Sequence, residues 1–365
     1  MHPDYQLRRN KLLTRINRAK LNCLLVTSET NVTYLTGFTG DSSWLLIGRD
    51  ITLLASDTRY TTQIEEECSE LDTHIRDSQT TQLESVAAIC KKSKINSLGI
   101  ESSNLTKSKF DALDSELDCE LVDTDGWIET LRAIKDKSEL AKIRTSIRCA
   151  ERAFEVIKSQ LTFDQTEREI AHNLEHQIRK FGGTECAFDP IVGVGDRSAL
   201  PHGVPGYKQI EESGFVLIDW GAKVNGYASD LTRVLVTGKI PSRIRKIYEI
   251  VLDAQQKAIS KIRPGVTFKS VDAAARQRIQ KAGFGKKFGH GLGHGFGLQI
   301  HEEPFINPIK EGILKQNMVV TIEPGIYLPG VGGVRIEDDV LVTRDGCEVL
   351  SSLPKTIEEN TIAID

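Results

Sequence analysis

The sequence lacks the long apolar runs and the surplus of one charge sign that would associate it with a membrane or with nucleic acid. No stretch of its 365 residues reaches the roughly 18 consecutive apolar residues of a membrane-spanning helix. Its 47 lysines and arginines are balanced by 51 aspartates and glutamates, which leaves a net charge of -4 and no basic excess. The N-terminal segment MHPDYQLRRNKLLTR also lacks the apolar core of a signal peptide. We therefore expect no membrane partner and no nucleic-acid partner.

The sequence also lacks any cysteine pattern typical of a disulfide framework or a zinc site. Its seven cysteines are scattered, odd in number and never at the C-x-x-C spacing. Because a reducing compartment suits such a chain, we predict a cytoplasmic protein. With 39% hydrophobic residues and the length of about two average domains, the chain is expected to fold around two cores.

The first 130 residues alternate short apolar runs with helical patterns, which favours an α/β domain with a partly parallel sheet. No phosphate-binding loop or dinucleotide fingerprint accompanies these runs. The predicted strands are Cys23–Val26, Trp44–Ile47, Ile51–Leu54, Leu98–Ile100 and Leu121–Val122. The pattern changes near Asp125-Gly126, and we take residues 1–130 and 131–365 as the two domains.

Two amphipathic helices open the second domain. Asp136 and Glu139 have the spacing of a capping box, which marks the start of the first helix. Its apolar stripe comprises Leu140, Ile143, Ile147, Ala150, Phe154, Ile157 and Leu161. A second helix ends at Gly182-Gly183, and its apolar stripe comprises Ile170, Leu174 and Ile178.

The second helix contains the sequence His172-Asn173-Leu174-Glu175-His176, which matches the HxxEH signature of one class of zinc peptidases. Two histidines four residues apart on a helix are able to share a metal ion. Both histidines, however, point away from the apolar stripe, and no third ligand is evident. We interpret this match as an exposed polar face, with a helix-borne metal site as the competing interpretation.

An acid lies inside each arm of a predicted hairpin. Asn225-Gly226 is the strongest short hairpin signal, and counting back from that loop places Gly221 opposite Asp230. Asp219 then lies diagonally opposite Asp230 on the same face, within side-chain reach. Two carboxylates that close repel each other unless a proton or a cation lies between them. We expect Gly221 to leave the room that an ion needs; the alternative is an exposed hairpin with incidental acids.

Two further acids belong to apolar strands near the C-terminal end of the second domain. The run Met318–Ile322 leads into Glu323, and the segment Val334–Val340 alternates so that Arg335, Glu337 and Asp339 share a face. A glutamate at a strand end is most often solvated. Acids in apolar strands, in contrast, are rarely found without a partner, and here four of them occur in one domain.

Histidines gather where glycine is most dense. His290 and His294 have equal parity and are able to face the same way from one strand, whereas His301 requires a bend that the glycines permit. A structural histidine is the commoner outcome for any one of them. Together with the neighbouring Glu302 and Glu303 and the four acids elsewhere, the three histidines favour a metal site.

The motifs that carry these residues resemble those of the pita-bread metallopeptidases: IDWGAKVNGYASDLTR, HGLGHGFGLQIHEEP, TIEPGIYL and GGVRIEDD. Within that group the chain is similar to the family of Xaa-Pro aminopeptidases and Xaa-Pro dipeptidases. NVTYLTGFTGDSSWLLI and SDTRYTTQ resemble the family's creatinase-like N-terminal domain, and LRAIKDKSELAKIR resembles the helix that opens its catalytic domain. The resemblance covers nearly the whole chain. It implies an α/β creatinase-like domain over residues 1–130 and an α+β pita-bread catalytic domain over residues 131–365.

The resemblance further implies a centre of two divalent metal ions. Asp219 and Asp230 would hold one ion, with Asp230 also bridging, while His294 and Glu323 would hold the other and Glu337 would bridge both. This hard, oxygen-rich set suits Mn²⁺, with Co²⁺ and Zn²⁺ as the other candidates. The two ions would bring the pKa of a shared water near neutrality, giving a bridging hydroxide that attacks the scissile carbonyl.

The same resemblance implies roles for residues around the ions. His202, His290 and His301 match the family's substrate-binding and proton-handling histidines. Glu323 matches its proton shuttle, and Arg335 matches the arginine beside the bridging glutamate.

The implied activity is hydrolysis of the bond between an N-terminal residue and a following proline by a homodimeric Xaa-Pro aminopeptidase. The Xaa-Pro amide is tertiary and has no N–H, which makes a dedicated pocket physically reasonable. Xaa-Pro dipeptidase is the alternative activity, and a metal-free binding protein on the same fold is the alternative from another class. Trp220 departs from the smaller residue typical of the family, and we expect it to shape the pocket.

Overall fold

A computed structural model describes residues 4–363 of the chain, which divide into two compact units. The first unit ends at Arg132 and the second begins at Ala133. The predicted limit between residues 130 and 131 lies inside α6 (Trp127–Arg132), the last helix of the first unit. Among the residues described, no helix is long and apolar enough to cross a membrane.

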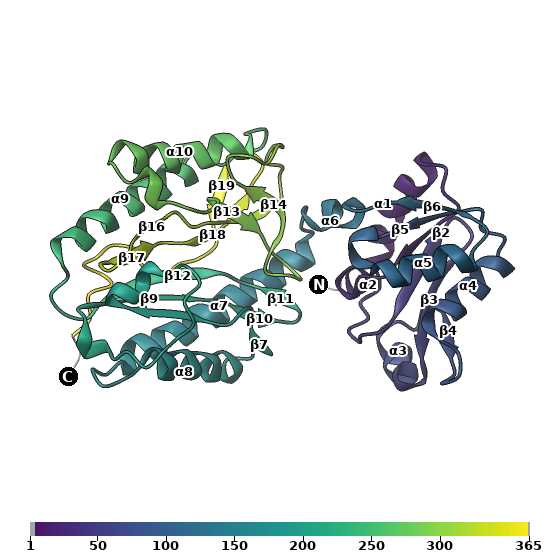
Figure 1. Ribbon diagram of the computed structural model, residues 1–365, viewed down its shortest axis with the longest axis horizontal. Helices are drawn as coiled ribbons and strands as arrows, with labels where there is room; N and C mark the ends of the chain where they lie inside the picture. The colour runs from purple at the N-terminus through teal and green to yellow at the C-terminus, as the bar shows by residue number, and fades with distance from the viewer. Residues whose placement is uncertain (1–3, 364–365) are drawn as a thin grey trace. The chain divides into compact units, whose positions relative to one another are not determined.

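The first unit contains one mixed sheet. Its strands are β1 (Cys23–Val26), β2 (Trp44–Gly48), β3 (Thr52–Asp57), β4 (Asp72–Arg76), β5 (Ser97–Ile100) and β6 (Glu120–Asp123). They lie in the order β4-β3-β2-β1-β5-β6 (Figure 1). The pairs β3–β4, β1–β5 and β5–β6 are parallel, and β2 is antiparallel to both of its neighbours. The predicted partly parallel sheet and its five strands are confirmed, and β4 is an additional strand.

Three helices of the first unit, α1 (Tyr5–Arg18), α4 (Gln82–Lys92) and α5 (Lys107–Glu116), begin at capping residues. The side chains of Asp4, Thr81 and Thr106 each accept a hydrogen bond from the backbone N–H three residues on, which satisfies a free donor of the first turn. The other helices are α2 (Glu29–Thr36), α3 (Thr61–Glu67) and α6, with the 3₁₀ turns η1 (Thr58–Tyr60) and η2 (Ser102–Asn104).

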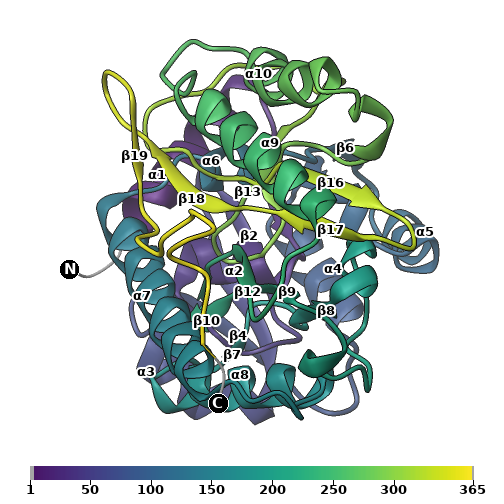
Figure 2. The same cartoon turned by 90° about the vertical axis from the view of Figure 1, so that its left-hand side faces the viewer.

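Two helix pairs enclose the strands of the second unit. Figures 1 and 2 show α7 and α8 on one side of these strands and α9 and α10 on the other. The predicted capping box is confirmed, because Asp136 and Glu139 each accept a backbone hydrogen bond from the other residue. The helices are α7 (Lys137–Gln160), α8 (Glu167–Lys180), α9 (Ser242–Ile259) and α10 (Phe268–Lys281), with the 3₁₀ turns η3 (Gly195–Ala199), η4 (Ile210–Glu212) and η5 (Gly285–Lys287).

The strands of the second unit form several small antiparallel sheets. They are β7 (Glu185–Cys186), β8 (Ile191–Val194), β9 (Phe215–Trp220), β10 (Ala222–Val224), β11 (Tyr227–Ala228), β12 (Leu231–Val236), β13 (Gly293–Gly295), β14 (Glu302–Ile306), β15 (Val319–Ile322), β16 (Gly325–Leu328), β17 (Gly332–Arg335), β18 (Asp338–Val342) and β19 (Cys347–Val349). The sheet orders are β12-β9-β8, β11-β10-β7, β14-β13-β15-β18-β19 and β16-β17.

Successive residues of β9 face different helix pairs. Leu217 packs in the core that includes α9 and α10, whereas Trp220 packs in the core that includes α7 and α8. The Trp220 ring stacks on Phe154 with centroids 4.3 Å apart, and its Nε1–H donates to the carbonyl of Ala150 at 3.0 Å. The expectation that Trp220 shapes the substrate pocket is therefore wrong, because alternation along the strand turns it away from the face that carries Asp219.

The predicted hairpin register is confirmed. Asn225 and Gly226 have φ values of 50° and 80°, the left-handed region that a type I′ turn requires at both positions. β10 and β11 pair beside this turn, and the same register continues into β9 and β12, where Thr232 lies opposite Asp219. Asp230, which precedes β12, is therefore diagonal to Asp219.

Gly221 is required by the backbone and not by an ion. A Cβ at this position would lie 1.9 Å from the carbonyl oxygen of Ser229, so only glycine permits the two strands to approach this closely. Our expectation that Gly221 leaves room for an ion gave the wrong physical reason for a glycine at this position.

The HxxEH sequence lies on the solvent side of α8. His172 and His176 are both exposed, and Glu175 accepts hydrogen bonds from Arg179 one turn along the helix. The predicted exposed polar face is confirmed. All seven cysteines are unpaired, as their spacing predicts.

Candidate metal centre

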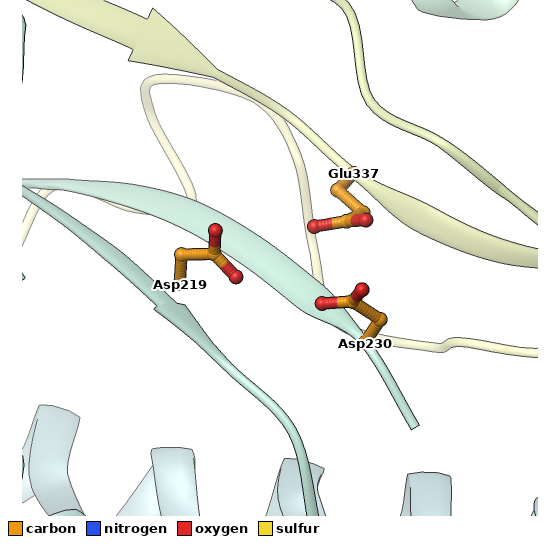
Figure 3. A group of neighbouring side chains, drawn as sticks. All are labelled: Asp219, Asp230 and Glu337. Atoms are coloured by element: carbon orange, nitrogen blue, oxygen red, sulfur yellow. The ribbon is translucent and has the colours of Figure 1, made fainter. Parts of the chain in front are cut away.

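Three carboxylates from separate segments converge in the second unit. Asp219 comes from β9, Asp230 precedes β12, and Glu337 lies between β17 and β18. Each offers an oxygen atom within 4.8 Å of the other two, and all three side chains are buried. Figure 3 shows the three carboxylates pointing toward one another. The sequence places Glu337 more than 100 residues after Asp230, and the fold brings them together.

Two of these carboxylates are held at one oxygen only. Arg335 Nη2 donates to Asp219 Oδ2 at 2.5 Å, and the hydroxyl of Thr232 donates to Glu337 Oε2 at 2.6 Å. Asp219 Oδ1 and Glu337 Oε1 are buried and have no hydrogen-bond partner. Because a buried carboxylate oxygen without a donor is strongly disfavoured, these atoms are suited to a bound cation.

His294 and Glu323 extend the cluster. The Nε2 atom of His294 lies 3.5 Å from Asp230 Oδ2 and 3.5 Å from Glu323 Oε1. The Nδ1 atom of His294 lies 3.1 Å from the carbonyl of Gly295, which can only accept, so Nδ1 carries the proton and Nε2 has a free lone pair. Burial lowers the pKa of His294 to about 4, which keeps the ring neutral as a metal ligand requires.

The charges of the acids oppose one another. Burial, followed by repulsion from Glu337 and Asp219, raises the pKa of Asp230 well above its ordinary value. Burial and repulsion from Glu323 and Asp219 raise the pKa of Glu337 in the same way, and burial raises the pKa of Glu323 to about 8. The pKa of Asp219 is also raised by burial, against the opposing effect of Arg335. Divalent cations would relieve this repulsion, so the donor set fits them.

Arg335 belongs to a chain of hydrogen bonds that includes a residue not predicted from the sequence. Its Nη1 donates to Tyr327 Oη at 2.6 Å, and Tyr327 Oη lies 2.9 Å from His290 Nε2. His290 Nδ1 lies 2.8 Å from the carbonyl of Gly291, so Nδ1 carries the proton and Nε2 accepts from the tyrosine. Both ring nitrogens of His290 are thus engaged within the protein, and a contact with substrate would require one of these bonds to open.

A cavity of about 370 Å³ opens onto the carboxylates. Its wall includes His202 and His301 together with Asp219, Asp230 and Glu323. Both of these histidines are exposed, and the ring of His301 lies edge-on to His294 with centroids 4.5 Å apart. His294 and Glu337 also line the cavity, and the rest of the wall is formed by Asp189, Gly203 and the apolar residues Phe188, Pro190, Ile191, Val204, Pro205 and Ile300. The structure therefore brings all the predicted site residues to one region.

The sequence of this chain matches two known domain families. Residues 141–344 match metallopeptidase family M24, and residues 8–134 match the creatinase/prolidase N-terminal domain. The chain belongs to metallopeptidase family M24. The predicted creatinase-like N-terminal domain and pita-bread catalytic domain are accordingly confirmed, as is the assignment to proline-specific metallopeptidases.

Similar M24 proteins align with this chain over almost its entire length. An Xaa-Pro dipeptidase of Pyrococcus horikoshii is 36% identical over 348 residues, which are 95% of this chain and 97% of that protein. The structure of an Xaa-Pro dipeptidase from Bacillus anthracis has a TM-score of 0.93 at 38% identity and covers 97% of this chain and 99% of its own. The structure of an X-Pro aminopeptidase from Thermotoga maritima has a TM-score of 0.87 at 35% identity and covers 96% of this chain and 100% of its own.

Proposed function

We propose that this M24 peptidase is an Xaa-Pro dipeptidase that uses two divalent metal ions. The observation that carries the proposal is the convergence of three buried carboxylates, the partly buried Glu323 and one imidazole on the wall of a single cavity. In metal-assisted hydrolysis, two bound ions polarise the scissile carbonyl and lower the pKa of a water nucleophile. The relatives favour the dipeptidase over our first prediction, the aminopeptidase, because dipeptidases of two organisms match 95% and 97% of this chain.

The proposed ligands are Asp219, Asp230, His294, Glu323 and Glu337. Asp219 and Asp230 would hold one ion, His294 and Glu323 would hold the other, and Asp230 and Glu337 would bridge the pair. Because four of the five donors are carboxylates, Mn²⁺ is the proposed ion, and Co²⁺ or Zn²⁺ would also suit the site.

The remaining proposed roles belong to side chains that face the cavity or support the ligands. Arg335 orients Asp219 through the bond from its Nη2, and Thr232 orients Glu337 through its hydroxyl. The Oε2 atom of Glu323 receives the proton lost by the nucleophile and returns it to the leaving proline nitrogen. His202 and His301 contact the substrate from the exposed wall, and His290 supports Arg335 through Tyr327.

Hydrolysis of paired substrates tests the choice between dipeptidase and aminopeptidase. We expect the purified protein with added Mn²⁺ to release proline from Leu-Pro and to leave Leu-Pro-Ala intact. The aminopeptidase is kept as the second candidate because the Thermotoga maritima structure, that of an X-Pro aminopeptidase, covers 96% of this chain. Release of leucine from Leu-Pro-Ala at a comparable kcat/KM would replace the dipeptidase by that second candidate.

Metal analysis tests the enzyme against the metal-free binding protein. We expect about two equivalents of Mn²⁺ per chain after reconstitution and loss of hydrolysis after treatment with a chelator. A protein that binds no divalent ion and cleaves neither peptide would support the binding protein instead.

The quaternary state and compartment complete the proposal. We propose a homodimer, which light scattering coupled to size-exclusion chromatography measures. The seven unpaired cysteines support a reducing compartment, so we propose a cytoplasmic location, which fractionation of the source cells tests.

A further inference from the structure

One wall of the cavity is a loop that projects from the body of the catalytic unit. Residues 199–206 connect η3 to the segment that precedes η4, and the cavity is lined by His202, Gly203, Val204 and Pro205 from this loop. Two of its apolar side chains are notably exposed: Leu200 at 49% and Val204 at 80%. Since these side chains have little packing of their own, hydrogen bonds hold the loop. The backbone N–H of Arg168 donates to the carbonyl of Gly206 at 3.0 Å, and two side chains provide further anchors.

The first anchor is Glu167, whose side chain is fully buried at the first position of α8. Its Oε1 accepts from the backbone N–H of Val194 at 2.8 Å, and its Oε2 accepts from the backbone N–H of Gly206 at 2.7 Å. A single carboxylate therefore joins the end of β8 to the end of the loop. Charge-assisted bonds of this kind are among the stronger hydrogen bonds in proteins.

The second anchor is Arg197, which connects Glu167 to the middle of the loop. Its Nε donates to both oxygens of Glu167, at 2.8 Å and 3.0 Å, and its Nη2 donates to the carbonyl of Val204 at 2.7 Å. On the other side of His202, Arg335 Nη2 lies 3.3 Å from the carbonyl of Pro201. His202 is thus held between an anchor at the metal cluster and an anchor at α8.

We propose that Glu167 and Arg197 are positioning residues that hold the His202 loop against the substrate cavity. Neither residue lines the cavity, so their effect reaches the substrate through the loop and through β8, whose Ile191 lies on the cavity wall. The inference rests on the proposed hydrolysis of Xaa-Pro peptides, in which His202 contacts the substrate. Loosening the anchors weakens substrate binding and leaves the five metal ligands in place.

The test compares two neighbouring glutamates of α8. Glu167→Gln removes the charge that holds Arg197, and its amide group, in either orientation, leaves one of the two backbone N–H donors without an acceptor. Glu169→Gln is the matched control, because it removes an equal charge from the same helical turn. Glu169 is exposed and accepts only from Thr166, the N-cap residue, in the contacts that the structure shows. Arg197→Lys is the second variant and decides the question if Glu167→Gln does not fold.

For Glu167→Gln, we expect KM for Leu-Pro to rise roughly tenfold, while kcat and bound Mn²⁺ stay within about twofold of the original protein. We also expect faster amide hydrogen exchange over residues 199–208 in both anchor variants and unchanged exchange in Glu169→Gln. An unchanged KM, or an equal change in Glu169→Gln, overturns the positioning role. If the unaltered protein cleaves no Xaa-Pro peptide, the proposed function fails by itself. In that case, hydrogen exchange alone tests whether Glu167 and Arg197 hold the loop. Equal exchange rates over residues 199–208 in Glu167→Gln and in the original protein would overturn their positioning role.

Discussion

Replacing Arg335 by methionine tests whether a bound metal ion and the guanidinium of Arg335 both neutralise the carboxylate of Asp219. The two side chains are 3% and 10% exposed, and Arg335 is the hydrogen-bond donor that the structure shows for Asp219. Removing one partner of a buried ion pair costs about 3–5 kcal/mol. We expect that loss in the free energy of unfolding of metal-free Arg335→Met. With Mn²⁺ present the ion neutralises Asp219, and we expect roughly half of that loss.

Arg233→Met is the matched control for this experiment. Arg233 donates to Asp338 at 2.8 Å in an ion pair that is also buried, and Asp338 is not among the proposed ligands. Arg233 also donates to the backbone carbonyl of Glu337, but the structure shows no hydrogen bond from it to the carboxylate of a proposed ligand. The loss of unfolding free energy in Arg233→Met should therefore depend far less on Mn²⁺ than the loss in Arg335→Met. Urea unfolding followed by the fluorescence of Trp220, the one tryptophan after residue 132, measures both variants. An equal loss for Arg335→Met in both conditions, or a larger loss with Mn²⁺, would refute the shared-charge reasoning.

Three further predictions follow from the same geometry. Asp230→Asn should lose at least one equivalent of Mn²⁺ and nearly all hydrolysis while its circular dichroism is unchanged; retained turnover would contradict its bridging role. Trp220→Phe should lower the free energy of unfolding by about 1 kcal/mol, because it loses the hydrogen bond to the carbonyl of Ala150. Its kcat should be unchanged. A changed kcat would mean that the Trp220 ring reaches the cavity. In the metal-free protein, the pKa of Glu323 is raised from 4.5 to about 8, so the folded state holds a proton that the unfolded state releases. Above about pH 6.5, where the histidines of the unfolded chain are also neutral, stability should therefore fall as pH rises to about 8 and should become nearly independent of pH when Mn²⁺ is bound; a rise of metal-free stability over that range would contradict the sign.

The hairpin shows how much of the site local sequence can predict. Asn225-Gly226 specifies a two-residue turn, and strand register then follows by counting, so the diagonal placement of Asp219 and Asp230 could be predicted without a structure. Glu323 and Glu337 were also identifiable, because an acid in an apolar strand is unusual. How these later strands approach the hairpin is set by packing between sheets, which no local pattern encodes.

Other features left no such signal. β4 has the polar sequence DTHIR and forms the edge of its sheet, where one side needs no apolar residues. Thr232 and Tyr327 support the site through single hydroxyl groups, and a hydroxyl in an apolar strand is too common to indicate a role. Trp220 was misplaced because a resemblance between sequences compares residue types and does not reveal which face of a strand a side chain occupies.

Asp219 and Glu337 are each held at one oxygen by the protein, with the other oxygen left without a donor. Their orientation is consequently fixed by Arg335 and Thr232 before any ion arrives. We therefore expect that one divalent ion would replace another without rearrangement of these two carboxylates. A preformed site of this kind would discriminate little among divalent ions of similar size. We therefore expect the availability of each metal in the surroundings to determine which ion the enzyme uses.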